Sequence, residues 1–306
     1  MTLRTAVSLF AALVLTACPA LAQQQPKPTA VPANVEFLKN VVYGKGGDKD
    51  LVLNLARPKP SADGKAGGGK AGPLPCVVVL HGGGWAAGSK DSHNDLVVNL
   101  ALRGYVAATV GYRFAPADPF PAQVHDVKCA VRYLRAHADQ YNLDPTRLGA
   151  VGFSAGAHLS MMLGTTDKAD GLEGEGGWPE PSSKVQAVVS FFGPTNLAAA
   201  DLLPNTSPIL NKFLGGTLAQ KPDAYKQASP VTFVRRDTAP MLLFQGTNDN
   251  LVNWKQAVEM TDALAKNGVD GRIELLLGEG HGWQGPELKR TADATFAFFA
   301  EKLGKK

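Results

Sequence analysis

Residues 147–164, RLGAVGFSAGAHLSMMLG, decide the fold class of this 306-residue chain. The first seven residues form an apolar strand pattern, and an Ala-rich helical pattern follows Ser154 directly. The serine stands between Gly152 and Gly156 where one pattern gives way to the other. Glycines permit the close backbone approach that a tight strand-to-helix turn requires. We therefore predict a nucleophile elbow that raises Ser154 above the carboxyl edge of a sheet.

The same alternation of patterns continues on both sides of this stretch. Near-continuous apolar segments predict strands at 74–80, 105–112, 147–153, 185–192, 240–246 and 272–278. Amphipathic segments predict helices at 92–104, 122–141, 155–164, 253–268 and 286–304. Apolar strands separated by amphipathic helices indicate an α/β protein with a mostly parallel central sheet and helices on both faces. Two further strand patterns, 35–44 and 51–58, predict an antiparallel hairpin at one edge.

The first 22 residues have the pattern of a secretory signal peptide. Arg4 precedes an apolar segment, 6–17, that is shorter than the ~20 residues of a membrane span. Ala20 and Ala22 provide the small residues of a cleavage site, so we predict an exported, periplasmic or secreted protein. The competing hypothesis is a lipid anchor at Cys18, because LTAC resembles a lipobox, although Pro19 fits that motif poorly. Residues 23–34 are predicted to be a Pro-rich linker, and 35–306 to form one domain.

Composition excludes several other classes of function. The 31 Lys+Arg and 27 Asp+Glu residues are scattered, so no basic block predicts a nucleic-acid partner. No later segment is apolar enough to predict a membrane span. The chain has no Cys/His cluster with metal-binding spacing, and we predict neither a metal nor another cofactor. Cys76 and Cys129 lie in apolar patterns and are expected to be buried free thiols.

A serine hydroxyl needs a base before it can act as a nucleophile. His158 is the nearest histidine, but it belongs to the helix that leaves the turn, and we expect it to be structural. His281 follows the last predicted strand and Asp249 follows the strand before it, and catalytic groups collect at such strand ends. We therefore predict Ser154 as nucleophile, His281 as base and Asp249 as the acid that orients it. Weaker candidates for the acid are Asp201, Asp237 and Glu279.

The stretch HGGGW, residues 81–85, follows the strand at 74–80 directly. Attack on a carbonyl group develops negative charge on its oxygen, and each fixed N–H donor that stabilises this charge contributes roughly 3 kcal/mol. We predict such donors at Gly83, Gly84 and Ala155. His81 is expected to hold the loop, and Trp85 and Trp283 lie beside the predicted catalytic loops as candidates for substrate binding.

From residue 37 to residue 303 the sequence resembles secreted bacterial esterases of the α/β-hydrolase superfamily. It is most similar to the hormone-sensitive-lipase-like carboxylesterases and the bifunctional acetyl-xylan/feruloyl esterase group. The similar blocks are HGGGW, GYRFAP, HDVKCAVRYLRAHA, GFSAGAHL, FFGPTNL, ASPVTFV, FQGTNDNLV and GHGW. The order serine, aspartate, histidine is that of α/β-hydrolases. Two positions depart from the group: Ala157 replaces a frequent glycine, and Asn196 stands where an aspartate is common.

The resemblance implies an α/β-hydrolase catalytic domain that cleaves a small-molecule or carbohydrate ester. A long insert at about 193–238 is expected to form a short cap over the site. Because no long apolar lid is evident, short-chain acyl or aryl esters are favoured, including acetyl or feruloyl groups on plant polysaccharide. Two alternatives stay open: an amide hydrolase, formamidase or peptidase, with the same triad, and a noncatalytic binding module.

Overall fold

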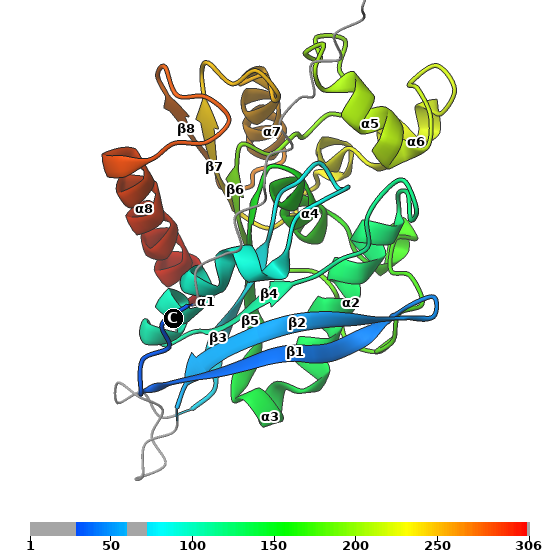
Figure 1. Ribbon diagram of the computed structural model, residues 1–306. Coiled ribbons are helices and arrows are strands. Elements are labelled where there is room, and N and C mark those ends of the chain that lie inside the picture. Colours follow the sequence, from blue (N-terminus) through cyan, green and yellow to red (C-terminus); the bar gives the residue numbers. More distant parts are fainter. Residues whose placement is uncertain (1–28, 60–71, 305–306) are drawn as a thin grey trace, which may run out of the picture.

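The computed structural model describes residues 29–59 and 72–304 (Figure 1). The predicted signal peptide, the lipidation hypothesis at Cys18 and residues 23–28 of the predicted linker lie outside these residues. No helix in the described part of the chain is both long and apolar enough to cross a membrane.

Eight strands form one sheet in the order β1-β2-β4-β3-β5-β6-β7-β8. The strands are β1 (Val35–Gly46), β2 (Lys49–Pro58), β3 (Leu74–Leu80), β4 (Val106–Val110), β5 (Leu143–Phe153), β6 (Ala187–Phe191), β7 (Met241–Gly246) and β8 (Gly271–Leu276). β2 is antiparallel to both of its neighbours, β1 and β4, and all other pairings are parallel. The predicted mostly parallel sheet with an antiparallel hairpin at one edge is confirmed.

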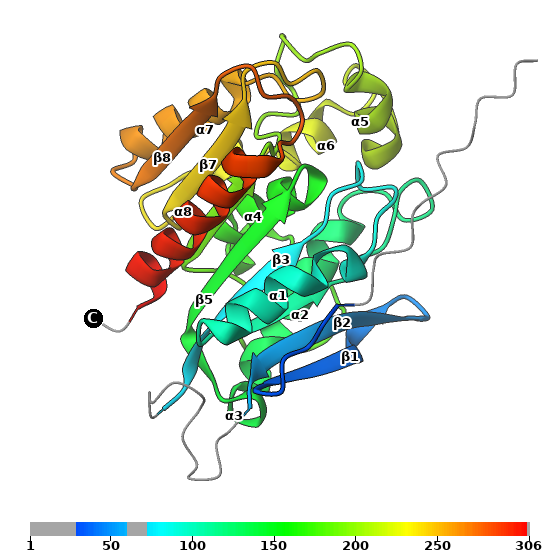
Figure 2. The same cartoon turned by 60° about the vertical axis from the view of Figure 1, so that its left-hand side comes forward.

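Helices cover both faces of this sheet. They are α1 (Asn94–Leu102), α2 (Ala122–Ala136), α3 (Ala138–Tyr141), α4 (Ala155–Thr165), α5 (Ser207–Leu214), α6 (Pro222–Gln227), α7 (Lys255–Lys266) and α8 (Gly285–Leu303). Helices α1 and α8 pack on one face, as Figure 2 shows, and α2, α4 and α7 pack on the other. Short 3-10 helices stand at Lys90–His93, Lys168–Asp170 and Pro230–Phe233.

Strand β3 shows why the buried strands have near-continuous apolar sequences. Successive side chains of a strand point to opposite faces of its sheet. Cys76 and Val78 lie in the core shared with α2 and α4, while Val77 and Val79 lie in the core shared with α1 and α8. Both faces therefore require apolar residues.

Cys76 and Cys129, which lie in the described part of the chain, are free and buried, as the sequence predicts. Burial raises the pKa of the Cys76 thiol to about 12 and that of Cys129 to about 11. Both thiols are therefore protonated at neutral pH and poor nucleophiles.

Two predicted elements differ from the structure. The single helix expected at 122–141 is split into α2 and α3, because the backbone leaves the helical region at His137 (φ −108°, ψ 28°). The insert between β6 and β7, where no helix was predicted, contains α5 and α6. Each of these helices has a proline in its first turn, Pro208 or Pro222, which is a helix-start signal that sequence analysis did not use.

Candidate active site

Ser154 lies at the junction of β5 and α4 with a backbone conformation of φ 53° and ψ −119°. Such a conformation is strained for a residue with a side chain, and strain of this kind concentrates at functional sites. The backbone N–H of Ser154 donates to the carbonyl oxygen of Phe191 at 2.9 Å and fixes the turn to β6. A Cβ on Gly152 would lie 2.2 Å from the oxygen of Gly156, and a Cβ on Gly156 would lie 2.2 Å from that of Leu80. The close approach predicted from the two glycines is therefore present.

The structure brings the three predicted triad residues into one hydrogen-bonded chain. Nε2 of His281 lies 2.9 Å from Oγ of Ser154, and Nδ1 of His281 lies 2.8 Å from Oδ2 of Asp249. Asp249 stands in the loop after β7 and His281 in the loop after β8. Parallel pairing of β5, β6, β7 and β8 places the carboxyl ends of these strands at one edge, which is why residues 127 positions apart meet.

The surroundings of Asp249 favour its ionised form. Its Oδ1 accepts hydrogen bonds from the backbone N–H groups of Leu251 at 2.8 Å and Val252 at 2.9 Å. Burial raises the pKa of this carboxyl, but the hydrogen bonds from His281 and from the backbone outweigh burial and hold the pKa below its ordinary value. A carboxylate at this position orients Nδ1–H of His281 toward itself and leaves the Nε2 lone pair for the serine hydroxyl.

Gln245, on β7, is a neighbour of the triad that sequence analysis missed. Its Nε2 donates to Oδ2 of Asp249 at 2.9 Å and to the carbonyl oxygen of Val252 at 3.1 Å. Nothing in its sequence pattern distinguishes this buried glutamine from an ordinary strand residue. The three weaker candidate acids make no described hydrogen bond to His281. Asp237 pairs with Lys184, Asp201 lies beside Asn253, and the Glu279 carboxylate has no described partner.

The three predicted oxyanion donors border the same site. Gly83 and Gly84 have φ values of +120° and +58°, which glycine adopts without strain. Ala155 is the first residue of α4, and N–H groups at a helix start have no partner within the helix. Among the described residues, none accepts a hydrogen bond from these three N–H groups. Their assignment as oxyanion donors stays a prediction.

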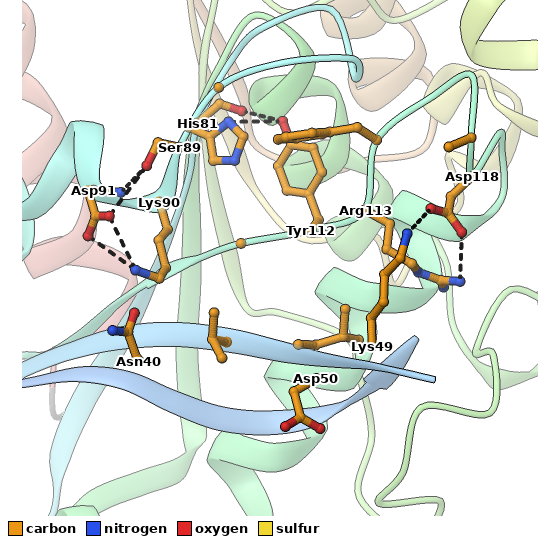
Figure 3. A pocket seen from close by; sticks show the side chains of 16 residues that line it. Asn40, Lys49, Asp50, His81, Ser89, Lys90, Asp91, Tyr112, Arg113 and Asp118 are labelled. Carbon is orange, nitrogen blue, oxygen red and sulfur yellow. Dashed lines mark hydrogen bonds and ion pairs between the residues drawn. The ribbon is translucent and has the colours of Figure 1, made fainter. Parts of the chain in front are cut away.

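His81 and Tyr112 hold the start of the glycine loop in place. The hydroxyl of Tyr112 donates to the carbonyl oxygen of His81 at 2.7 Å, and the two rings stack with centroids 4.3 Å apart (Figure 3). Nδ1 of His81 lies 2.7 Å from the carbonyl oxygen of Gly82. The expected structural role of His81 is consistent with this placement.

These two residues also line a cleft of about 590 Å³ that contains neither Ser154 nor His281. Its lysines have carboxylate partners: Lys49 lies 3.3 Å from Asp118, and Lys90 lies 3.2 Å from Asp91 (Figure 3). Both lysines of the cleft are thus engaged in ion pairs.

His158 is fully buried, and the structure gives it a structural position. The indole N–H of Trp85 donates to Nδ1 of His158 at 3.1 Å, and Nε2 of His158 donates to the carbonyl oxygen of Ala228 at 2.6 Å. Trp85 in turn stacks on Phe213 of α5, with ring centroids 4.1 Å apart. His158 therefore joins the glycine loop to the insert and lies outside the triad.

A cavity of about 450 Å³ contains Ser154 and His281. Its apolar walls include Trp85, Phe153, Phe192, Ile209, Leu251 and Val252. Ile209 belongs to α5, so the predicted cap insert does border the site. Sequence analysis missed Phe153 and Phe192 as wall residues, because an aromatic residue at a strand end has no signal beyond its apolar character.

The structure does not bring Trp283 to this cavity. Its indole N–H donates to Oγ1 of Thr291 at 2.9 Å, and its ring packs 5.4 Å from that of Phe192. Trp283 therefore supports a wall residue from behind, while Trp85 forms part of the wall.

Comparison with known proteins agrees with this architecture. A model of the BD-FAE family matches residues 67–264, which is more than half of the chain. The chain belongs to the BD-FAE family. Among curated relatives of this BD-FAE protein, the probable carboxylic ester hydrolase LipM of Mycobacterium tuberculosis is 31% identical over 74% of this chain and 51% of its own. The chain spans about half the length of the curated relatives it matches.

Solved structures similar to this BD-FAE protein are also esterases by name. A carbohydrate esterase from gut microbiota has a TM-score of 0.75 and 26% identity, covering 91% of this chain and 100% of its own. Esterase 2 of Thermogutta terrifontis, with propionate bound, has a TM-score of 0.71 and 27% identity, covering 90% and 97%. The expected α/β-hydrolase fold and the resemblance to esterases are confirmed.

Within the described residues, no group of three or more His, Cys, Asp or Glu side chains is placed to hold a metal ion.

Proposed function

We propose that this BD-FAE protein is a carboxylic ester hydrolase that works through an acyl-enzyme on Ser154. The observation that carries the proposal is the chain of hydrogen bonds from Asp249 through His281 to Ser154, at 2.8 Å and 2.9 Å, within one cavity. The names of the relatives support the same reaction class.

In the first half of the proposed reaction, Oγ of Ser154 attacks the ester carbonyl carbon while Nε2 of His281 accepts the hydroxyl proton. The carbonyl oxygen becomes an oxyanion, which the N–H groups of Gly83, Gly84 and Ala155 stabilise. The bond from the carbonyl carbon to the alcohol oxygen then breaks. His281 returns its proton to that oxygen, so the alcohol leaves neutral and the acyl group stays on Ser154.

In the second half, water attacks the acyl carbon and gives one proton to Nε2 of His281. The bond to Oγ of Ser154 breaks, and the serine takes the proton back, which releases the carboxylic acid. Asp249 remains ionised throughout and stabilises the imidazolium that forms twice in the cycle. Its lowered pKa supports this role.

The cavity favours small esters. About 450 Å³ with mainly apolar walls accommodates a short acyl or an aryl group, and Trp85 offers an aromatic surface to either. We therefore propose short-chain acyl or aryl esters as substrates, including acetyl or feruloyl groups on plant polysaccharide. The similar structures of a carbohydrate esterase and of a propionate-bound esterase support this class.

We further propose that residues 35–306 form the catalytic domain, with a cap insert at about 193–238. Residues 1–22 are proposed as a signal peptide and 23–34 as a linker, so that the protein acts in the periplasm or outside the cell. Detection of mature protein that starts at Gln23 in the exported fraction tests this proposal. Detection of a lipid-modified Cys18 contradicts it.

The reaction is tested by hydrolysis of acetyl, butyryl and feruloyl esters, acetylated xylan and N-formylkynurenine. We expect ester hydrolysis by the native protein and a loss of about 10⁴-fold or more in Ser154→Ala. Equal activity in both proteins contradicts the mechanism. Cleavage of N-formylkynurenine alone supports an amide hydrolase instead, and binding without turnover supports a noncatalytic module.

A further inference from the structure

A second cavity, of about 280 Å³, lies between α1 and α8, next to the candidate active site. Its apolar walls include Phe191 at the end of β6, Leu96 of α1, and Ala292 and Phe296 of α8. His93 completes the wall near α1, and burial lowers its pKa to about 4. Its imidazole is therefore neutral at pH 7, and the charged side chain in the lining is that of Asp95, which is exposed.

Phe153 lies at the border between this second cavity and the candidate active site. It is the residue that the described walls of both cavities share. Its ring stacks on His93 at 4.3 Å and on Phe191 at 4.9 Å, both of which line the second cavity. Its ring also lies 6.3 Å from that of Phe192, which lines the active-site cavity. Phe153 directly precedes Ser154, so this border lies beside the proposed nucleophile.

We propose that Phe153 is the specificity-determining residue that restricts this enzyme to short esters, because its ring closes the active-site cavity off from the second cavity. The inference rests on the proposed ester hydrolysis. Without the ring, an apolar chain of the substrate extends from the active-site cavity of about 450 Å³ into the second cavity of about 280 Å³. Each substrate methylene that becomes buried in the second cavity raises kcat/KM about fourfold over that of the ester one methylene shorter.

The experiment measures kcat/KM for two series of esters. One series varies the acyl group, from 4-nitrophenyl acetate to the decanoate, and the other varies the alcohol, from methyl acetate to decyl acetate. We expect Phe153→Ala to raise the ratio of long-chain to short-chain kcat/KM by at least about tenfold in one of the two series, which also identifies the part of the ester that enters. Phe153→Leu is expected to give an intermediate ratio, and thermal unfolding shows that each variant is folded.

Two further variants distinguish a passage into the second cavity from general loosening of the site. Phe192→Ala enlarges only the active-site cavity and should not produce the long-chain gain. Ala292→Phe, added to Phe153→Ala, fills the second cavity from α8 and should remove the gain. An unchanged ratio in both series, or a gain that survives Ala292→Phe, overturns the inference.

Binding of the product acids separates this inference from the proposed reaction. Calorimetry with butyrate and octanoate gives an affinity ratio that needs no turnover, and Phe153→Ala should shift it by at least about tenfold toward octanoate. If no ester is hydrolysed but this ratio shifts, the proposed reaction fails while the role of Phe153 stands. If esters are hydrolysed but neither ratio shifts, the role of Phe153 fails.

Discussion

The indole N–H of Trp85 donates to Nδ1 of His158 at 3.1 Å, so the histidine nearest to the serine in sequence holds the glycine loop. Nε2 of the same ring donates to Ala228 at 2.6 Å, in the insert between β6 and β7. One buried imidazole thus connects the elbow helix, the loop with the proposed oxyanion donors and the insert between β6 and β7.

Replacing His158 by phenylalanine leaves the Trp85 N–H and the Ala228 carbonyl without their partners. An unsatisfied buried polar group costs about 1–3 kcal/mol, so we expect His158→Phe to lower the free energy of unfolding by about 2–4 kcal/mol. Urea titration measures this loss. The matched control is His137→Phe, which removes one contact to Tyr133 at the end of α2 and should cost less. An equal cost for both variants contradicts the connecting role of His158.

Burial of His158 also predicts a pH dependence of stability. Its folded pKa is lowered from 6.5 to about 4, so below pH 6.5 the unfolded chain binds a proton that the folded protein does not. The stability present above pH 6.5 is therefore lost as the pH falls toward 4, by roughly 3 kcal/mol from this residue. Urea titrations between pH 4 and pH 7.5 measure the slope, and His158→Gln should reduce it. A slope that persists undiminished in this variant argues against His158 as its source.

Asp249→Asn tests the proposed orientation of His281. An amide at this position favours the wrong imidazole tautomer while keeping the shape of the site, and we expect kcat to fall about 10⁴-fold. The control is Asp201→Asn, which changes an exposed acid beside Asn253 and should leave kcat within about twofold. Steady-state kinetics on 4-nitrophenyl acetate measures both variants, and similar kcat values for the two would show that Asp249 is not the triad acid.

Gln245→Leu tests a positioning role for the hydrogen bond to Oδ2 of Asp249. Loss of a donor to a carboxylate costs about 1.5–3 kcal/mol, so kcat should fall about 10- to 100-fold. A carboxylate with one donor fewer holds a proton more tightly, and the acidic limb of the pH–kcat/KM profile should move to higher pH. Gln256→Leu removes another buried glutamine, which bonds to Thr195, and should lower stability without moving that limb. If the acidic limb of the profile moves equally in both variants, the role of Gln245 is only structural.

Ala157 stands where the similar esterases often have a glycine, and we predict that it is energetically coupled to Gly193. A Cβ on Gly193 would lie 2.6 Å from Cβ of Ala157 and 2.8 Å from Oγ of Ser190. We expect Gly193→Ala to lower the free energy of unfolding by about 1–3 kcal/mol, because the core has no room for the added methyl group. Adding Ala157→Gly should recover part of this loss, and a double-mutant cycle measures the coupling. If the effects of the two substitutions on the free energy of unfolding add strictly, the added methyl group does not clash with Ala157.

Features that depend on residues close together in the sequence were predictable, and features that depend on the packing of distant residues were not. Strands such as β3 were predictable because a strand covered on both faces needs an unbroken apolar sequence. The proposed roles of Asp249 and His281 followed from their places after consecutive predicted strands. Phe153 as a partition and Gln245 as a donor were not predictable, because each depends on which distant residues pack against it.

By itself, the sequence determined the α/β class, the turn at Ser154 and the residue types available for chemistry, because periodicity and glycine spacing act over a few neighbouring residues. Only the tertiary structure decided how the predicted histidine reaches the serine. The parallel order of β5, β6, β7 and β8 carries His281 to 2.9 Å from Ser154, while α4 turns His158 away into the core beside Trp85. Residues far apart in the sequence come close in space when their strands pair side by side. His281 therefore meets Ser154 although 127 positions separate them.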